Sequence, residues 1–465
     1  MVTYQDLLKV GENEKDRIDF VRKAITDHMQ SNLYRQAARA YKYYDGENET
    51  LMKYQKTIVK ITGEVIPDRY AANHKSPSNF IELFVTQQNQ YLLGNGITWS
   101  NEYTKNKLGN DFDEIVQDVG ENCLIGAVSF GFWNLNHVEM FTVMEFAPLW
   151  DEENGSLRSG IRWWQIDSDK PFRATLYEED GYTEYIWNKN KDGQEDGAIL
   201  REKQKYIINV RSSEVDGVEI LDGENYPSFP IVPCWANKRH KNPLARYLAG
   251  VDAYDFIKNG YTNDFDEAQL YWIIKGAGGM DDPDLAQFLQ RLKTVKAAAP
   301  SDGQEIEAVT VDIPYEAREK LLDRIAEDLY KDAMALDFTS VINGADTATQ
   351  IKAAYDSLDK KCDKYEWCIT KFVKSILDLA KVDDDPTYTR SKVVNVQEEI
   401  QTILQAAPYL SQDYVTRKIL TLLGDGDQAD EIINQMVADE LDRGSVLAEQ
   451  EKEKEEEETD EDVIE

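Results

Sequence analysis

The sequence predicts an α+β protein that is predominantly helical, and two patterns lead to this prediction. Along three long segments within residues 242–379, apolar residues recur every three or four positions, which is the periodicity of one helix face. Within residues 126–234 the segments are short and rich in β-branched and aromatic residues. Hairpin-type turns separate these segments at Asn154-Gly155, Asp180-Gly181 and Asp192-Gly193. We therefore expect one antiparallel sheet packed with helices.

The charge of the chain argues against a protein that grips nucleic acid. Its 465 residues carry a formal net charge of −35, and the sequence pI is about 4.5. Affinity for DNA comes largely from lysine and arginine side chains that neutralise phosphates, and here acids dominate. The same charge is compatible with a protein past which DNA slides.

The sequence also sets expectations about compartment. No run of about 18 apolar residues is present, so we expect no membrane helix. The N-terminal residues lack the basic and then apolar order of a signal peptide. Four cysteines, Cys123, Cys234, Cys362 and Cys368, show no CxxC spacing, and we expect reduced, buried thiols.

Before the sheet, three helices are predicted. Residues 16–44 form one amphipathic pattern that ends at a Tyr-Asp-Gly turn. Asn79 is a plausible cap for a helix that starts at Phe80 and stops at the glycines around Asn95. The third helix covers residues 112–125, and a hairpin or mobile connection is expected near residues 57–61.

The long apolar ladders define the second half of the chain. They predict helices over 244–275, from Tyr315 onward, and over 351–379. Between the first two lies a small insert, with a helix over 282–292 and strands over 294–299 and 305–313.

After the third ladder, an Asp383-Asp384-Asp385-Pro386 break, interpreted as a solvated loop, precedes helices over 396–405, 411–423 and 428–441. Ser411 and Asp427 are their plausible caps. Residues 449–465 contain eleven acids and two lysines, which predicts a disordered tail.

A search for catalytic chemistry finds little. No GxxxxGK[ST], HExxH or GxSxG motif is present, and the four histidines are scattered. The carboxylates of Asp281, Asp282 and Asp284 suit a helix N-terminus better than a nuclease metal site. Aromatic residues between Trp163 and Trp187 could form a platform for bases, but core packing is the commoner use. We predict no enzyme activity, no metal and no cofactor.

Several motifs resemble those of tailed-bacteriophage portal proteins, of the siphophage type that infects Gram-positive hosts. The resemblance covers roughly residues 41–441. The matching motifs are Tyr43-Tyr44-Asp45-Gly46, Asn79-Phe80 through Tyr91-Leu92-Leu93-Gly94-Asn95, Val251-Asp252-Ala253-Tyr254, Asn263-Asp264, and Gly344 through Tyr355. The chain departs from the family pattern at Gly96, where proline is usual, and at Asp346 and Thr347, where a Ser-Gly pair is usual.

The resemblance implies a portal fold and a closed ring, usually of twelve subunits. The implied regions are a wing (1–243), a first stem helix (244–275), a clip (276–314), a second stem helix (315–338), a tunnel loop (339–350), a long wing helix (351–382), a crown (383–448) and the acidic tail (449–465). The ring would sit at the capsid vertex of the virion, after assembly in the host cytoplasm. Double-stranded DNA would pass through it during packaging and ejection.

The implied partners are the terminase large subunit at the clip, the major capsid and scaffold proteins, and a head-completion adaptor, with no membrane partner. The expected channel-lining stem residues are Glu319, Asp323, Glu327 and Lys331. The expected DNA-facing tunnel-loop residues are Ser340, Asn343, Gly344, Asp346, Thr347 and Thr349. Asp281, Asp282 and Asp284 are expected to face the terminase.

Two functions from other classes stay open at this point. A non-viral acidic scaffold or adaptor could use the same long helices without forming a closed ring. A metal-dependent nuclease could use the aspartates of the insert, and it would then need Mg²⁺.

Overall fold

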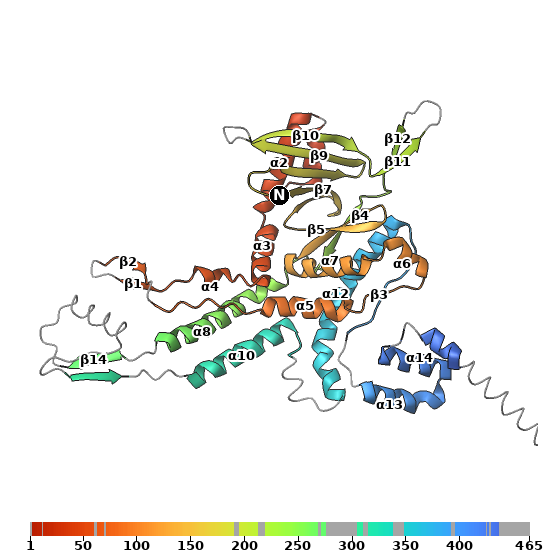
Figure 1. Cartoon of the computed structure of the whole chain (residues 1–465). Coiled ribbons are helices and arrows are strands. Elements are labelled where there is room, and N and C mark those ends of the chain that lie inside the picture. The colour runs from red at the N-terminus through yellow and green to blue at the C-terminus, as the bar shows by residue number, and fades with distance from the viewer. Residues whose placement is uncertain are drawn as a thin grey trace, which may run out of the picture. The chain divides into compact units, whose positions relative to one another are not determined.

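The computed structural model divides the chain into two compact units. It describes residues 2–11, 13–59, 63–68, 71–189, 195–212, 219–267, 271–275, 305–309, 315–337, 348–391, 396–424, 426 and 429–436. Unit 1 comprises Met1–Leu336 and Ser357–Ser391, and unit 2 comprises Asp337–Asp356 and Lys392–Glu465. The fold is α+β and mostly helical, as predicted (Figure 1).

Unit 1 contains two main antiparallel sheets, whereas we expected one. The first has the order β10-β9-β8-β7-β6 and is a meander of β6 (Phe146–Trp150), β7 (Leu157–Trp164), β8 (Phe172–Glu178), β9 (Gly181–Lys189) and β10 (Glu195–Gln204). The second has the order β13-β4-β5, with β4 (Val128–Asn134), β5 (His137–Thr142) and β13 (Ile231–Trp235). The chain turns away from the second sheet after β5, and in this turn the Glu145 carboxylate accepts a hydrogen bond from the Thr142 amide.

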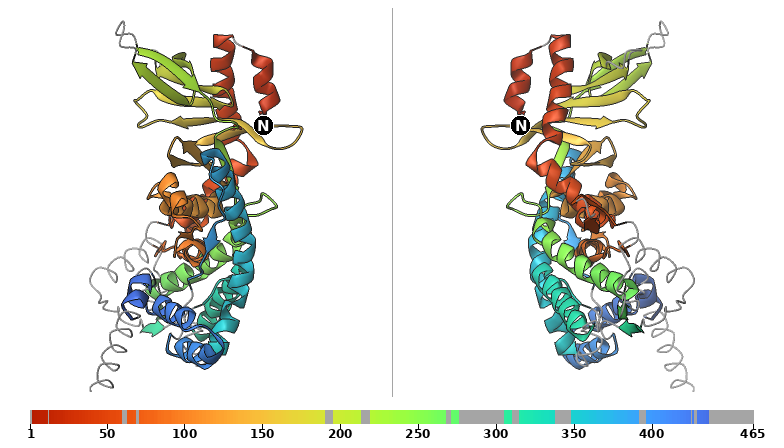
Figure 2. Two further views of the ribbon diagram at one scale, coloured as in Figure 1. Left: turned by 90° about the vertical axis from the view of Figure 1, so that its right-hand side faces the viewer. Right: turned by 90° about the vertical axis from the view of Figure 1, so that its left-hand side faces the viewer.

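The first sheet is covered by N-terminal helices. In both views of Figure 2, α1 (Tyr4–Val10) and α2 (Glu14–Met29) lie against one of its faces. Val21 and Ile25 of α2 share a buried cluster there with Trp163, Tyr185 and Trp187. This confirms core packing for these aromatic side chains; Trp164 alone among the tryptophans of that group is partly exposed.

The predicted single helix over 16–44 is two helices. After α2, the extended backbone of Ser31 starts α3 (Asn32–Tyr44), and the Ser31 hydroxyl accepts a hydrogen bond from the Tyr34 amide. A serine N-cap favours a new helix start, so the apolar pattern continues while the helix axis does not.

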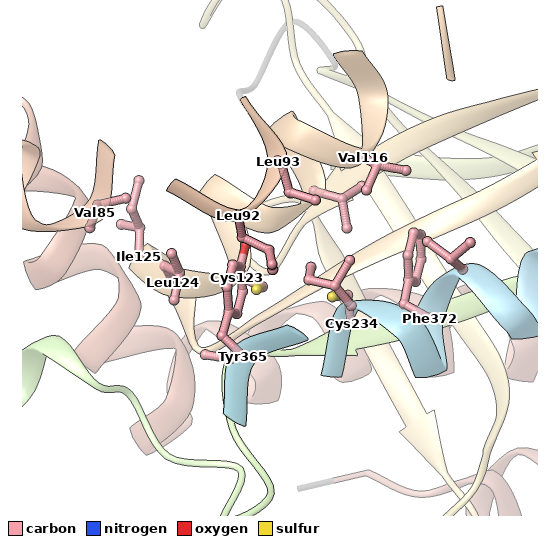
Figure 3. Packing of buried hydrophobic residues seen from close by; sticks show 14 of the residues in the cluster. Val85, Leu92, Leu93, Val116, Cys123, Leu124, Ile125, Cys234, Tyr365 and Phe372 are labelled. Atoms are coloured by element: carbon pink, nitrogen blue, oxygen red, sulfur yellow. The ribbon is translucent and has the colours of Figure 1, made fainter. Parts of the chain in front are cut away.

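A helical layer forms the largest core. It contains α5 (Phe80–Leu93), α6 (Glu102–Leu108), α7 (Phe112–Gly126) and much of α12 (Ala348–Ala380). Figure 3 shows Leu92 and Leu93 of α5, Cys123 of α7 and Tyr365 and Phe372 of α12 in one buried cluster. Helix α5 starts after Asn79 as predicted, although the Asn79 side chain makes no capping hydrogen bond. All four cysteines are free and buried, as predicted.

Small elements complete unit 1. The predicted connection near residue 57 is a hairpin of β1 (Thr57–Val59) and β2 (Val65–Pro67), which follows α4 (Glu49–Lys53). A second short pair joins β3 (Ile97–Thr98) to β16 (Thr387–Tyr388), far apart in sequence. A third joins β11 (Ile207–Ser212) to β12 (Glu219–Glu224).

Two helices lie side by side and lead to a strand pair at their far end (Figure 1). They are α8 (Leu248–Glu267), after the 3-10 turn η1 (Leu244–Arg246), and α10 (Tyr315–Ala333). The prediction of helix over 244–275 is wrong at its end, because β14 (Tyr271–Lys275) pairs with β15 (Glu305–Val309). Tyr-Trp-Ile-Ile is rich in β-formers, and cross-strand pairing outweighs helical periodicity there.

The second predicted stem helix also ends early. Helix α10 stops at Ala333 and not at residue 338, because Met334 adopts a left-handed backbone with φ of 51°. The predicted strand over 305–313 is observed as β15 for 305–309, and residues 310–313 lie outside the described part. The predicted helix over 282–292 and strand over 294–299 also lie outside it.

Described by itself, unit 2 contains α13 (Val396–Ala406), the 3-10 turn η2 (Ala407–Tyr409) and α14 (Gln412–Leu423). The Ser411 hydroxyl accepts a hydrogen bond from the Tyr414 amide, which confirms the predicted cap. Residues 429–436 are helical, while Asp427 and residues 437–465, the acidic tail included, lie outside the described part. None of the described helices is both long and apolar enough to cross a membrane.

Candidate functional site

The exposed face of α10 carries the row of charges expected at the channel. Glu319, Asp323, Glu327 and Lys331 are all exposed and follow at intervals of four, so they lie along one face of the helix. The Lys331 ammonium nitrogen lies 3.1 Å from Glu327 Oε2. Among the described residues neither Glu319 nor Asp323 forms an ion pair, so three acids and one lysine leave this face net negative.

The opposite side of α10 packs on α8. Leu329 and Ala333 are buried, and Leu329 lies against Gly250 of α8. A Cβ atom at Gly250 would come within 2.8 Å of Leu329 Cδ2, so glycine permits the close approach of the two helices. Farther along the pair, Arg318 Nη1 lies 2.6 Å from Asp264 Oδ2. Packing on one side therefore fixes which side of α10 faces outward.

Helix α8 is held on another side by a ladder of buried polar side chains. Asp255, Asn259 and Asn263 are 0%, 3% and 2% exposed and are spaced by four residues. Their Oδ1 atoms accept hydrogen bonds from the backbone amides of Ser78 (2.9 Å), Ser76 (2.7 Å) and His74 (2.7 Å), respectively. We call residues 74–78 the strap.

The spacing of the three side chains along α8 matches the spacing of the three backbone amides along the strap. Four residues of helix rise about 6 Å, and two residues of extended chain rise about 6.6 Å. Every second amide of the strap thus meets the next side chain on α8. Asn259 Nδ2 also donates to the carbonyl oxygen of Ser76 at 2.9 Å, and His74 contacts Asp266 at the end of the ladder. The strap is thereby fixed in register along the helix.

Two motifs that carry the portal resemblance meet at the start of this ladder. The Tyr43 hydroxyl donates a hydrogen bond of 2.5 Å to Asp252 Oδ1. Arg39 and Thr50 donate to Asp252 Oδ2, each at 3.2 Å. One turn on, Asp255 Oδ2 accepts from the Asn48 amide nitrogen at 2.7 Å, and burial raises the pKa of Asp255. The two motifs thus form one polar junction between α3, α4 and α8.

Sequence reasoning missed the ladder and the junction, although a signal was present. Asp255, Asn259 and Asn263 interrupt an otherwise apolar-spaced helix at regular intervals of four. Polar residues repeated at that spacing on a helix that also has an apolar face indicate a second, polar contact surface.

The expected tunnel loop is described only at its end. Thr349 lies in α12, which starts at Ala348, so the predicted boundary at residue 350 is wrong by three residues. Ser340, Asn343, Gly344, Asp346 and Thr347 lie outside the described residues. The same holds for Asp281, Asp282 and Asp284 of the expected clip.

The aspartate run after α12 has a structural role that the sequence did not indicate. Asp384 accepts hydrogen bonds from the Thr104 hydroxyl (2.6 Å) and the backbone amides of Ser100 and Asn101. The Thr104 hydrogen bond is the largest influence that lowers the pKa of Asp384. The run is a loop with Asp383 and Asp385 exposed, as predicted, and Asp384 in addition ties it to residues 100–104. Within the described ranges no cluster of three or more metal-ligating side chains occurs.

Comparisons with known proteins address the family directly. The family model described as phage portal protein, SPP1 Gp6-like, matches residues 22–461, a longer stretch than the motifs indicated. The portal protein of Bacillus phage SPP1 is 23% identical over 419 residues, with 83% of this chain and 79% of the relative covered. That of Clostridium phage phiCD119 is 24% identical over 399 residues, with 78% and 84% covered.

Among solved structures, the chain is similar to one from the neck of an empty GTA particle with C6 symmetry. The TM-score is 0.42 at 10% sequence identity, with 74% of this chain and 90% of that chain covered. The family match decides against the non-viral scaffold and the nuclease. Because that match spans nearly the whole sequence, the chain belongs to the SPP1 Gp6-like family of phage portal proteins, non-enzymatic head–tail connectors at the portal vertex of the virion.

Proposed function

We propose that this chain forms a closed ring of twelve subunits through which double-stranded DNA is packaged and ejected. Family membership, which implies an oligomeric ring at the capsid vertex, is the observation that carries the proposal. A closed ring needs two different, complementary flanks on each subunit, and the α8–α10 pair offers distinct faces for them. Mass measurement of the purified assembly tests the subunit number; a chain that stays monomeric under capsid-assembly conditions would contradict the ring.

We further propose that the row on α10 lines the channel. Glu319, Asp323, Glu327 and Lys331 give each subunit a net negative stripe, and a ring multiplies it. A negative wall lets the DNA phosphates slide, whereas every cation in contact with a phosphate adds affinity. This accounts for a DNA conduit with a charge of −35.

Charge reversal tests the channel proposal. Glu319→Lys, Asp323→Lys and Glu327→Lys together should make the ring bind duplex DNA at low salt, with a steep loss of affinity as salt rises, and should slow packaging. The matched control is Asp196→Lys, Glu202→Lys and Glu224→Lys, three exposed acids on β10 and β12 with the same change in charge. Equal DNA binding by the two triple variants would place the α10 row outside the channel.

A further proposal concerns the segment that precedes α12. The segment that precedes α12, with Gly344 at its centre, is the tunnel loop and contacts the moving DNA. Gly344→Trp should leave ring mass unchanged and reduce packaging or DNA retention. Equal loss of assembly and packaging would instead assign the loop to the subunit interface.

The last proposal concerns the surfaces that bind partner proteins. Asp281, Asp282 and Asp284 face the terminase large subunit, while capsid and scaffold proteins bind the wing and a head-completion adaptor binds after packaging. Replacing the three aspartates by asparagine should weaken terminase binding while ring mass stays constant. Unchanged terminase affinity would remove these residues from that interface.

A further inference from the structure

An open cavity of about 410 Å³ lies in unit 1, away from α8 and α10. Its walls come from the turn between β6 and β7, from β13 with the loop that follows it, and from the outer side of α12. The volume is within the range of sites that bind small molecules or anchoring side chains. Nothing in the proposed channel function uses this cavity.

One wall is a stack of aromatic rings. The rings of Trp150 and Trp235 lie 5.6 Å apart at 29°, and the His240 ring lies flat on Trp235, at 3.9 Å and 10°. His240 has a left-handed backbone, with φ of 54°. Few non-glycine residues adopt this conformation, and residues held in it by their surroundings recur at binding sites.

The loop around His240 is built to hold this backbone conformation. Asn237 Oδ1 accepts from the Arg239 amide at 3.1 Å, and Asn237 Nδ2 donates to the Lys241 carbonyl oxygen at 2.7 Å. The His240 amide donates to the Asn237 carbonyl oxygen at 3.1 Å. The aromatic wall is therefore preformed, which lowers the entropic cost of binding.

Helix α12 adds an exposed tryptophan to the lining of the cavity. Trp367 on α12 is 50% exposed, and the Lys238 ammonium nitrogen lies 3.5 Å from its ring centroid. Tryptophan is enriched among the residues that dominate binding energy at protein interfaces. An ammonium held over the ring by a cation–π contact still has donors available for a second, anionic group.

Basic side chains outnumber acidic ones at the cavity, whereas acids dominate the chain as a whole. Lys238, Lys371 and His240 line the cavity, with Asp378 as the single acid. Among the described residues, neither lysine forms an ion pair. The cavity of this acidic chain thus combines an apolar hollow with two lysines whose charge is not neutralised by a neighbouring carboxylate of the described part of the chain.

We propose that this cavity is a docking site for a partner protein, which inserts an acidic segment carrying one bulky apolar side chain. The apolar side chain enters between the Trp150–Trp235–His240 stack and Trp367. The flanking carboxylates of the segment pair with Lys238 and Lys371. Charge complementarity selects an acidic occupant, and the aromatic walls select an apolar protein side chain over a nucleic-acid backbone, which would use the lysines without the hollow.

The experiment measures binding of short fluorescein-labelled peptides to the full chain by anisotropy. The probes are EEDFEE, which has acids and an apolar anchor, EEDAEE, which lacks the anchor, and KKNFKK, which reverses the charge. We expect EEDFEE to bind at least tenfold more tightly than either of the others, with affinity that falls as salt rises. Trp367→Ala and the double variant Lys238→Glu, Lys371→Glu should each lower its affinity about tenfold or more.

Matched controls keep the test specific. Trp164 is also a partly exposed tryptophan beside a cation, with Arg162 Cζ 5.6 Å from its ring centroid, but it lies outside the cavity. Trp164→Ala and the double variant Lys23→Glu, Lys105→Glu should bind EEDFEE like the wild type. Equal binding of the three peptides, or a loss in the control variants that matches that in the cavity variants, would overturn the proposal.

The partner class is tested separately. If the cavity variants changed the mass of the assembled ring and left peptide binding intact, the occupant would be a second copy of this chain. Tighter binding of duplex DNA than of EEDFEE at the same lysines would make it a nucleic-acid site. Either result would contradict the proposal without touching the channel function.

Discussion

Helices α12 and α8 are both central to unit 1, yet they are held by opposite chemistry. Tyr365 and Phe372 of α12 (Figure 3), together with Ile369, are fully buried in the largest apolar cluster of the described residues. Helix α8 instead presents Asp255 and Asn259 to the backbone of the strap, through directional hydrogen bonds.

Apolar burial and hydrogen bonds differ in how closely they fix the alignment of two segments. Apolar burial is strong and non-directional, and it supplies most of the contact of α12, to which the Tyr365 hydroxyl adds one buried hydrogen bond to Asn89 Oδ1 at 2.8 Å. Hydrogen bonds add less net free energy, but leaving a buried partner unpaired is costly, so the ladder specifies one alignment of α8 and the strap. The ladder therefore fixes which face of α8 is turned toward the strap and which face is left for other contacts.

The largest expected effect is on the apolar side of this comparison. Phe372 is 1% exposed and fits against Gly131 of β4, where an added Cβ would lie 2.6 Å from Phe372 Cζ. Phe372→Ala should lower the free energy of unfolding by about 3–5 kcal/mol, through lost burial and a cavity. Urea denaturation measures it, with Lys364→Ala on the exposed face of α12 as a control within about 0.5 kcal/mol. A loss below that of the control would show that α12 is not anchored by this cluster.

A smaller loss is expected on the polar side. Asp255→Ala leaves the Ser78 amide and the Asn48 side-chain amide without their acceptor, at a cost of about 1–3 kcal/mol for each unpaired buried group. Hydrogen exchange should lose protection at Ser78, and Asn263→Ala should act in the same way at His74 alone. Loss of protection spread evenly over α5 and α7 instead would mean that the strap and the core open together.

The pH dependence of stability tests the buried carboxyl group of the ladder, that of Asp255. Burial raises the pKa of Asp255 above its ordinary value of 3.8 in the folded state. For such a group the stabilising contribution is complete below the unfolded value and is lost as pH rises through the folded value. Asp255→Asn, which cannot ionise, should therefore gain stability relative to the wild type as pH rises from below 3.8 toward neutral. A difference between the two proteins that stays constant across this range would exclude burial of an ionised Asp255.

The fold was largely predictable from periodicity, which failed at points where another interaction decides the structure. Periodicity located α12 and the meander, because each buries a regular set of side chains. It failed at Tyr271–Lys275, where the apolar spacing continues but a partner strand distant in sequence decides the structure. It failed again at Ser31, where a single cap breaks a continuous apolar face into two helices. Non-local pairing and capping outweigh periodicity at such points.

The candidate site was predictable in part. The spacing of Glu319, Asp323 and Glu327 was enough to place them on one exposed helix face. The ladder on α8 was not found, because its partners are backbone amides of an extended segment about 180 residues earlier. Backbone groups carry no sequence signature, so only the polar half of such a contact is visible in a sequence.

The smallest expected effect concerns the α10 row itself. Glu319, Asp323 and Glu327 are exposed, and only Glu327 has an ion-pair partner among the described residues, Lys331 one turn away. Exposed pairs of this kind contribute about 0.3–0.5 kcal/mol. Glu319→Gln, Asp323→Asn and Glu327→Gln together should therefore change the free energy of unfolding by less than about 1 kcal/mol, while packaging, measured on the same variant, should fall. A large loss of stability would instead mean that these acids hold subunits together.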